Sequence, residues 1–147
     1  MDFIKLASCI LISREKLLVV HNSWKDKNLS GWTLPCGHVF RGETPRNSSI
    51  RELFEETGIV SDCRPMLVRS LQVFKGDNTV ILNYLYFFRS WNGNLTHEFD
   101  PDKIIDDVRF LPINLAINLL LYEDVKFALR SFLKCKQYCR LSFNLEI

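Results

Sequence analysis

The sequence lacks any apolar run as long as the roughly 20 residues that a membrane-spanning helix needs. Residues 6–9 resemble a lipoprotein cleavage site, but the few residues before them include Asp2 and form no apolar signal core. Repeats, low-complexity tracts and linker-like segments are also absent. We therefore expect no membrane partner and one domain over residues 1–147.

An excess of charge of one sign is missing as well. The 19 basic and 17 acidic residues give a formal net charge of only +2. Nucleic-acid binding normally needs a clustered basic face, so this balance disfavours a nucleic-acid partner. A small anionic ligand stays compatible, because one local basic patch is enough to hold it.

Cysteines are few and not arranged as a disulfide framework. Their number, five, is odd and their spacing is irregular, which favours a reduced, cytoplasmic compartment. Cys135 and Cys139 lie four residues apart on a predicted helix, without a second pair at metal-ligand spacing. We interpret them as buried apolar thiols and not as a zinc site.

The residues that are present predict a globular α/β protein. Hydrophobic residues make up 47% of the chain and include eleven Phe, enough for a sizeable core. Apolar, β-branched runs predict strands, the first two as a hairpin and 65–75 with 79–91 as another across Gly76. The predicted strands are 3–13, 16–20, 32–34, 65–75, 79–91 and 108–111.

Two helices are expected between and after these strands. Thr44 as N-cap, Pro45 at the first position and Gly58 after the last turn delimit the first helix. An apolar stripe over 115–133 predicts the second, C-terminal helix, whereas 36–44 should be irregular. The strand 79–91 is apolar on both faces and should be central in a mixed sheet. The fold class is thus an α/β sandwich.

The first helix carries an acidic stripe. At 100° per residue, Glu52, Glu55 and Glu56 fall within an arc of roughly 100°. Like charges at this spacing repel, and the helix dipole disfavours anions at the C-terminal end. A divalent cation such as magnesium or manganese reverses both effects, because it prefers oxygen ligands. The apolar residues Ile50, Leu53 and Phe54 fall on the opposite arc.

Neighbouring residues suit such a metal site. Arg51 can pair with Glu55 or reach back to Glu43, and so hold the carboxylates in place. Gly37 and Gly42 allow the preceding loop to approach a metal closely. Seven positions fit at fixed spacing, which makes a merely solvated acidic face the poorer interpretation.

Residues 37–59 resemble the Nudix box, whose pattern is G-x5-E-x7-R-E-U-x-E-E-x-G-U with U aliphatic. Every defined position of that pattern is present, from Gly37 to Ile59. One departure is Cys36, which stands where many members have a first glycine after the proline. The specific match covers about 28 residues, and the order of elements is compatible over nearly the whole chain.

The resemblance implies the Nudix α/β/α sandwich with a mixed sheet, a loop-helix-loop and a C-terminal helix. It implies hydrolysis, with Mg2+ or substituting Mn2+, of a nucleoside diphosphate linked to another moiety. Nucleoside triphosphates, ADP-ribose and nucleotide sugars all fit that description. The implied metal ligands are Glu52, Glu55, Glu56 and the Gly37 carbonyl, with Arg51 and Glu43 in support.

The sequence does not decide which residue is the general base or which residues contact a substrate. For the general base, Glu55 or Glu56 is the first choice and Glu98 the second. The candidates for contacts with a nucleotide substrate are Arg41, Asp107, Trp24, Phe74 and Tyr84. A non-catalytic, nucleotide-sensing Nudix domain is the alternative function, which the complete set of box carboxylates disfavours. A purely structural protein with a metal-stabilised loop is a third interpretation, and a homodimer is left open.

Overall fold

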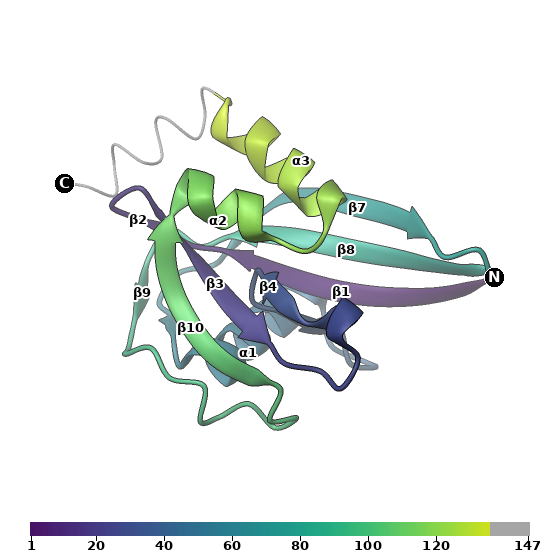
Figure 1. The fold of residues 1–147 in the computed structure, drawn as a ribbon, viewed down its shortest axis with the longest axis horizontal. Coiled ribbons are helices and arrows are strands. Elements are labelled where there is room, and N and C mark those ends of the chain that lie inside the picture. Colours follow the sequence, from purple (N-terminus) through teal and green to yellow (C-terminus); the bar gives the residue numbers. More distant parts are fainter. Residues whose placement is uncertain (136–147) are drawn as a thin grey trace.

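The computed structural model describes residues 1–135, arranged as strands sandwiched between helices (Figure 1). The strands are β1 (Asp2–Ile10), β2 (Ile12–Ser13), β3 (Lys16–Asn22), β4 (Gly31–Thr33), β5 (Cys36–His38), β6 (Val60–Ser61), β7 (Met66–Phe74), β8 (Thr79–Phe87), β9 (Trp91–Asn92) and β10 (Ile105–Pro112). The helices are α1 (Pro45–Thr57), α2 (Ile113–Leu119) and α3 (Glu123–Leu133), with a short 3-10 helix η1 (Lys27–Leu29).

One four-stranded sheet has the strand order β5-β1-β8-β7 and is mixed, as expected. Strand β8 lies inside it, parallel to β1 and antiparallel to β7, which confirms the central position predicted from its apolar faces. The turn at Gly76 joins β7 to β8, as predicted. Residues 36–38 form the edge strand β5 beside β1, so the prediction that 36–44 is irregular was wrong for 36–38 and is confirmed for 39–44.

A second sheet contains β10, β3 and β2, with β4 also paired to β3. The chain passes from the first sheet to the second at Leu11, between β1 and β2. The expected hairpin of 3–13 with 16–20 is therefore restricted to the short β2 paired with the start of β3. The longer β1 pairs with β8 instead, because its fully buried residues need a neighbour on each side.

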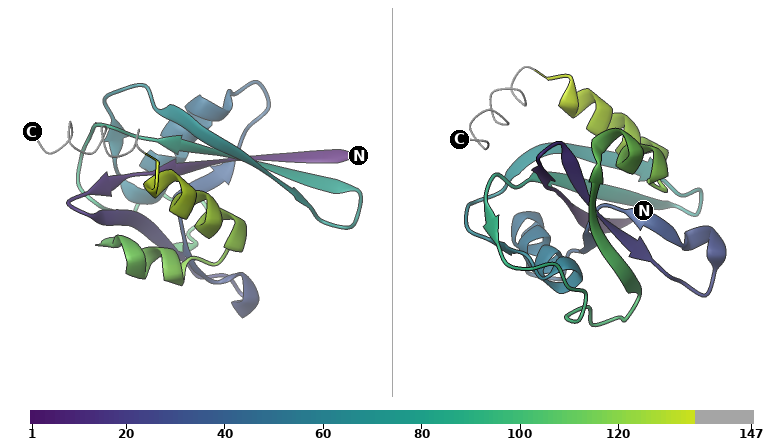
Figure 2. Two further views of the ribbon diagram at one scale, coloured as in Figure 1. Left: turned by 90° about the horizontal axis from the view of Figure 1, so that it is seen from above. Right: turned by 60° about the vertical axis from the view of Figure 1, so that its left-hand side comes forward.

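The helices cover opposite sides of the strands, so the layered α/β arrangement is confirmed (Figure 2). One hydrophobic cluster lies under α2 and α3 and includes Phe87 and Leu129, and the other lies under α1 and includes Leu53 and Phe88. Within residues 1–135, no helix is both long and apolar enough to cross a bilayer.

The predicted C-terminal helix is two helices. Leu120 has an extended backbone, and the Leu121 N–H donates to the Trp32 carbonyl at 3.0 Å. This pairing with β4 removes the chain from helical geometry between α2 and α3. Cys135 follows α3 and is exposed, so its expected burial on a helix was wrong. Cys139 lies outside the described residues.

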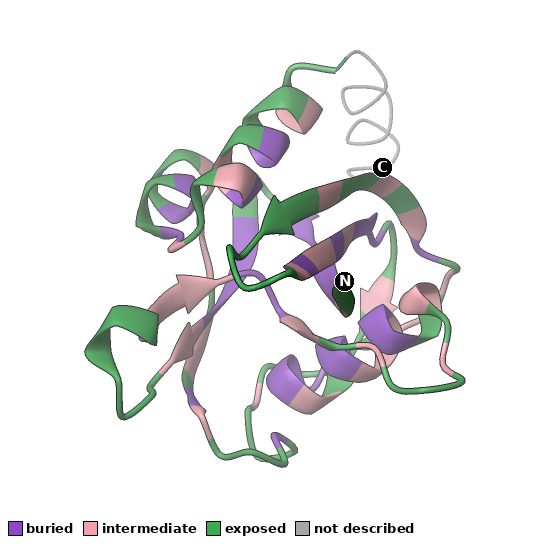
Figure 3. Cartoon of the chain, turned by 90° about the vertical axis from the view of Figure 1, so that its right-hand side faces the viewer, coloured by how far each residue is buried: buried purple, intermediate pink, exposed green. Residues whose placement is uncertain are grey.

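Helix α1 has the predicted ends. The Thr44 side chain accepts from the Asn47 N–H, Pro45 stands in the first turn, and Gly58 closes the helix with φ 76°. Its faces differ from the predicted pattern, because Phe54 is exposed and stacks on Phe99 of a distant loop. Figure 3 shows that α1 is buried or half-buried over much of its length.

Candidate active site

Strand β5 and helix α1 meet so closely that position 37 has no space for a side chain. Gly37 lies opposite Ala7 in the sheet, and a Cβ atom added to it would overlap the carboxylate of Glu52. The Gly37 backbone and the Glu52 carboxylate are thus adjacent, as a shared ligand role would require. This contact, and not an unusual backbone angle, explains why glycine occupies the position.

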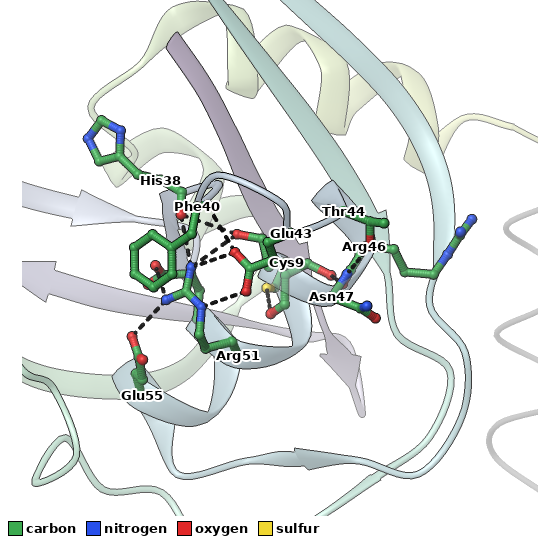
Figure 4. A network of polar contacts seen from close by, with 12 residues as sticks. Cys9, His38, Phe40, Glu43, Thr44, Arg46, Asn47, Arg51 and Glu55 are labelled. Atoms are coloured by element: carbon green, nitrogen blue, oxygen red, sulfur yellow. Dashed lines mark hydrogen bonds and ion pairs between the residues drawn. The ribbon is translucent and has the colours of Figure 1, made fainter.

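Arg51 ties the acidic residues together (Figure 4). Its Nε and Nη2 donate to the two oxygens of Glu43 at 2.8 and 3.0 Å. Its Nη1 donates to Glu52 Oε1 at 2.8 Å and to Glu55 Oε2 at 3.1 Å, and Nη2 also donates to the His38 carbonyl. Arg51 therefore makes both of the pairings predicted from the sequence, with Glu43 and with Glu55.

Two of the three glutamates on the stripe are buried, although a helix face rich in carboxylates is usually solvated. Glu52 and Glu56 are each only 8% exposed. Burial raises the pKa of Glu52 to about 6 and raises the pKa of Glu56 as well. Hydrogen bonding from Arg51 instead lowers the pKa of Glu43. The site therefore holds negative charge that Arg51 alone does not fully compensate, and an added cation would stabilise it.

Each of the three glutamates has one oxygen held by the protein. Arg51 holds Glu52 Oε1 and Glu55 Oε2, and the Cys36 N–H donates to Glu56 Oε1 at 2.8 Å. No hydrogen bond from residues 1–135 reaches the second oxygen of any of the three. Hard oxygen donors of this kind fit Mg2+ or Mn2+.

The ligand set is not closed around a metal position in the described part of the chain. No three acidic, His or Cys side chains of residues 1–135 already stand at metal-ligand spacing. A bound ion would therefore need water or substrate oxygens beside the glutamates to complete its shell, as is usual for Mg2+. Cys36 does not disturb the site, because it contributes its backbone N–H, while burial raises the pKa of its thiol to about 12.

The remaining candidates are dispersed. Glu98 is exposed, and among the described residues no hydrogen bond or ion pair joins it to the box. Arg41 is exposed in the turn before α1, and Trp24 is 48% exposed in the loop after β3. Phe74 is 68% exposed near the β7–β8 turn. Along the strands it lies several residues away from the segment of β1 that pairs with β5.

Tyr84 and Asp107 have local partners. Tyr84 packs beside the core under α1, which accounts for its position without a ligand. Asp107 accepts from Arg109 Nε at 2.8 Å on β10. The neighbouring Asp106 pairs with His21 at 2.7 Å.

Two further groups at the site are not among the candidates predicted from the sequence. In the loop before β10, Asp100 is buried and accepts from the backbone N–H groups of Ile104 and Ile105. Besides burial, its charge contributes to the raised pKa of Glu56. Phe40, the other group, lies over the Arg51 guanidinium. Neither has a spacing signal. Asp100 reaches the box only through folding, and Phe40 occupies one of the undefined positions between Gly37 and Glu43.

The family model described as the NUDIX domain matches residues 4–134. The chain belongs to the Nudix family. The match spans nearly all the described residues, so the Nudix family accounts for the fold as a whole and not for the box alone.

Curated relatives match over shorter stretches. An RNA pyrophosphohydrolase of Erythrobacter litoralis is 36% identical over 63 residues, which are 43% of this chain and 38% of that protein. A putative mutator protein MutT4 of Mycobacterium tuberculosis is 34% identical over 95 residues, 63% of this chain and 37% of that protein. The Nudix chain thus covers well under half the length of these relatives.

Solved structures share the fold over much more of the chain. The solution structure of the E. coli ORF135 protein gives a TM-score of 0.75 at 20% identity, covering 92% of this chain and 94% of that one. A MutT NUDIX hydrolase from Burkholderia pseudomallei gives 0.70 at 18% identity, covering 88% and 98%. At these identities the likeness establishes the Nudix fold and nothing finer.

Removing Arg51 should destabilise the Nudix chain much more than removing another paired arginine. R51M leaves Glu43 and Glu52 without their shared partner, and we expect a loss of roughly 2–3 kcal/mol in the free energy of unfolding. R109M breaks an exposed pair and should cost at most about 1 kcal/mol. Urea denaturation of both variants measures the difference, and equal losses would contradict the network.

Proposed function

We propose that this chain is a magnesium-dependent pyrophosphohydrolase. Its substrate would be a nucleoside diphosphate linked to another moiety, and water would attack a phosphorus of the pyrophosphate link. The observation that carries the proposal is the row of three glutamates on α1, each with one oxygen held and one available. Membership of the Nudix family supports it.

The residues proposed to hold Mg2+ are Glu52, Glu55, Glu56 and the Gly37 carbonyl. When bound, the ion would neutralise phosphate oxygens and lower the pKa of the attacking water. The buried position of Glu52 and Glu56 keeps bulk water away, which strengthens their electrostatic interactions.

The chain's own residues would divide the remaining tasks. Glu56 or Glu55 would accept the proton of the attacking water at a carboxylate oxygen. Burial raises the pKa of Glu56 in the metal-free fold, and a bound cation would lower it, so that Glu56 would be ionised and able to accept the proton when Mg2+ is present. Arg51 would keep Glu52 and Glu55 oriented through its two Nη1 bonds. Arg41, on the exposed turn, would meet substrate phosphates.

The substrate class is a further proposal. Relatives include proteins described as an RNA pyrophosphohydrolase and an 8-oxo-(d)GTP phosphatase. Both names point to a phosphate chain attached to a nucleoside. With a net charge of +2, we favour a free nucleotide, namely a nucleoside triphosphate, ADP-ribose or a nucleotide sugar, over an RNA end.

The deciding experiment is a substrate panel with Mg2+. It would contain nucleoside triphosphates, ADP-ribose, nucleotide sugars, dinucleoside polyphosphates and capped RNA, with phosphate or nucleotide release as readout. Turnover of at least one compound, dependent on Mg2+, is expected. Binding of a nucleotide without turnover of any compound would favour a sensing domain, and a magnesium-dependent melting shift without nucleotide affinity would favour a structural role.

The stabilisation by Mg2+ should depend on pH. Because the pKa of Glu52 is raised to about 6 in the metal-free fold, acidification through that pH protonates it before the unfolded chain takes up the proton. The metal-free fold therefore gains stability as the pH falls, whereas a protonated Glu52 cannot bind the ion. The increase in melting temperature caused by Mg2+ should accordingly shrink between about pH 7.5 and about pH 5.5. Thermal unfolding at both pH values tests this, and an unchanged increase would contradict it.

A further inference from the structure

An exposed aromatic ring covers the guanidinium that organises the site. The Cζ atom of Arg51 lies 3.7 Å from the centroid of the Phe40 ring, well within cation–π range. Phe40 is nevertheless 57% exposed, so it contributes little to the hydrophobic core. Figure 4 shows the ring beside the guanidinium, with Glu43 on another side of the same group.

A tight turn places the ring and the carboxylate together. The Glu43 N–H donates to the Phe40 carbonyl at 3.0 Å, and the Phe40 N–H donates to Glu43 Oε1 at 3.1 Å. Gly42 supplies the positive φ, +84°, that the third residue of a type II turn requires. The turn therefore presents two groups to Arg51: Glu43 binds the edge of the guanidinium and Phe40 covers its face.

The edge bonds alone leave one motion open. Nε and Nη2 are bound to Glu43, and Nη2 also donates to the His38 carbonyl and the Ser48 hydroxyl. All these bonds lie on one edge of the guanidinium, which can still tilt about that edge. Such a tilt would move Nη1 away from Glu52 and Glu55, which it holds at 2.8 and 3.1 Å. A ring stacked on the guanidinium face opposes this tilt.

We propose that Phe40 is a positioning residue that fixes the plane of the Arg51 guanidinium and thereby the orientation of Glu52 and Glu55. The inference rests on the proposed function, in which these glutamates bind Mg2+. Arg51 orients them and does not displace the ion, because it takes only one oxygen of each. Loss of the ring must therefore weaken Mg2+ binding.

The test is calorimetric titration of the full chain with Mg2+ alone. F40A should weaken Mg2+ binding by about fivefold, the size expected for one lost cation–π contact. F40Y keeps a ring and should stay within about twofold of the wild type. F40L keeps an apolar side chain without a ring face, and it should resemble F40A.

F127A is the matched control. Phe127 is 64% exposed on α3, and its ring centroid lies 5.9 Å from the Cζ of Arg69. The F127A variant therefore loses a ring and a cation contact of the same kind, but outside the box. Its Mg2+ affinity should equal that of the wild type.

A spectroscopic readout tests whether the ring lies over the guanidinium in solution. The ring current of Phe40 should displace the Arg51 Nε–H resonance in a nitrogen–proton correlation spectrum. That displacement should disappear in F40L and persist in F40Y. If F40L proved unstable, F40A would supply the same comparison, because both lack the ring.

The outcomes are distinguishable. If the wild type does not bind Mg2+, the proposed function fails together with the inference. If the wild type binds Mg2+ and F40A binds it equally well, only the role of Phe40 is overturned. Full rescue by F40L would overturn it too, because an apolar side chain would then be sufficient.

Discussion

E56Q should abolish nearly all hydrolysis while leaving the fold at least as stable as the wild type. The amide keeps the size of the side chain and still accepts from the Cys36 N–H. It cannot take a proton or supply a negative ligand, so we expect kcat to fall by about 10²–10⁴-fold.

The stability change distinguishes this effect from misfolding. Burial raises the pKa of Glu56, which means that its ionised form is unfavourable in the metal-free fold. A neutral glutamine removes that cost, so the melting temperature without Mg2+ should stay equal or rise. The Mg2+-dependent increase should be smaller than in the wild type.

The control is E123Q, the same chemical change at the start of α3. The Glu123 side chain is 83% exposed, and its one ion pair with residues 1–135 is with Lys126. Its kcat and Mg2+ response should match the wild type. If E56Q kept the wild-type kcat, Glu56 would have no part in the proposed reaction. If kcat fell as far in E123Q as in E56Q, the loss of activity would have a cause other than the box.

G37A should lower activity by about 10²-fold, because it displaces a carboxylate from its productive position. The added Cβ would overlap Glu52, and either that side chain or the β5 backbone has to move. The Mg2+ dissociation constant and kcat should both worsen, since Glu52 and the Gly37 carbonyl are proposed ligands of one ion.

G76A is the comparison. Gly76 has φ +77°, and apart from its two chain neighbours no heavy atom of residues 1–135 lies within 4 Å of the Cβ that alanine would add. Its cost is backbone strain of roughly 1 kcal/mol in stability, without an effect on Mg2+ affinity. Measurements of kcat, Mg2+ binding and melting temperature on G37A and G76A distinguish displacement of the Glu52 carboxylate from backbone strain. A G37A variant with wild-type Mg2+ affinity would show that Gly37 and Glu52 need not adjoin for metal binding.

The short-range features of this protein could be predicted well. The limits of α1 follow from Thr44, Pro45 and Gly58, each of which acts within one helical turn. The hairpin of β7 and β8 follows from two apolar runs and a glycine turn. The pairing of Arg51 with Glu55 follows from helix geometry, because residues four apart share a face.

Other features depend on parts of the chain that are far apart in sequence. The pattern of α1 predicted an apolar Phe54 face, yet Phe54 is exposed and its contact is with Phe99, from the loop before β10. The C-terminal stripe predicted one helix, yet the backbone of Leu121 bonds to Trp32 on β4 and interrupts it. The hydrophobic periodicity of one segment carries no information about contact partners elsewhere in the chain.

The sequence by itself determined which residue types line the box helix and at what spacing, since a helix converts spacing directly into a shared face. Only the tertiary structure decided that Glu52 and Glu56 are buried and that Gly37 adjoins Glu52. The same holds for Phe40, which covers Arg51. Burial is decided by what the rest of the chain packs against a side chain, and the raised pKa values of the glutamates follow from that burial.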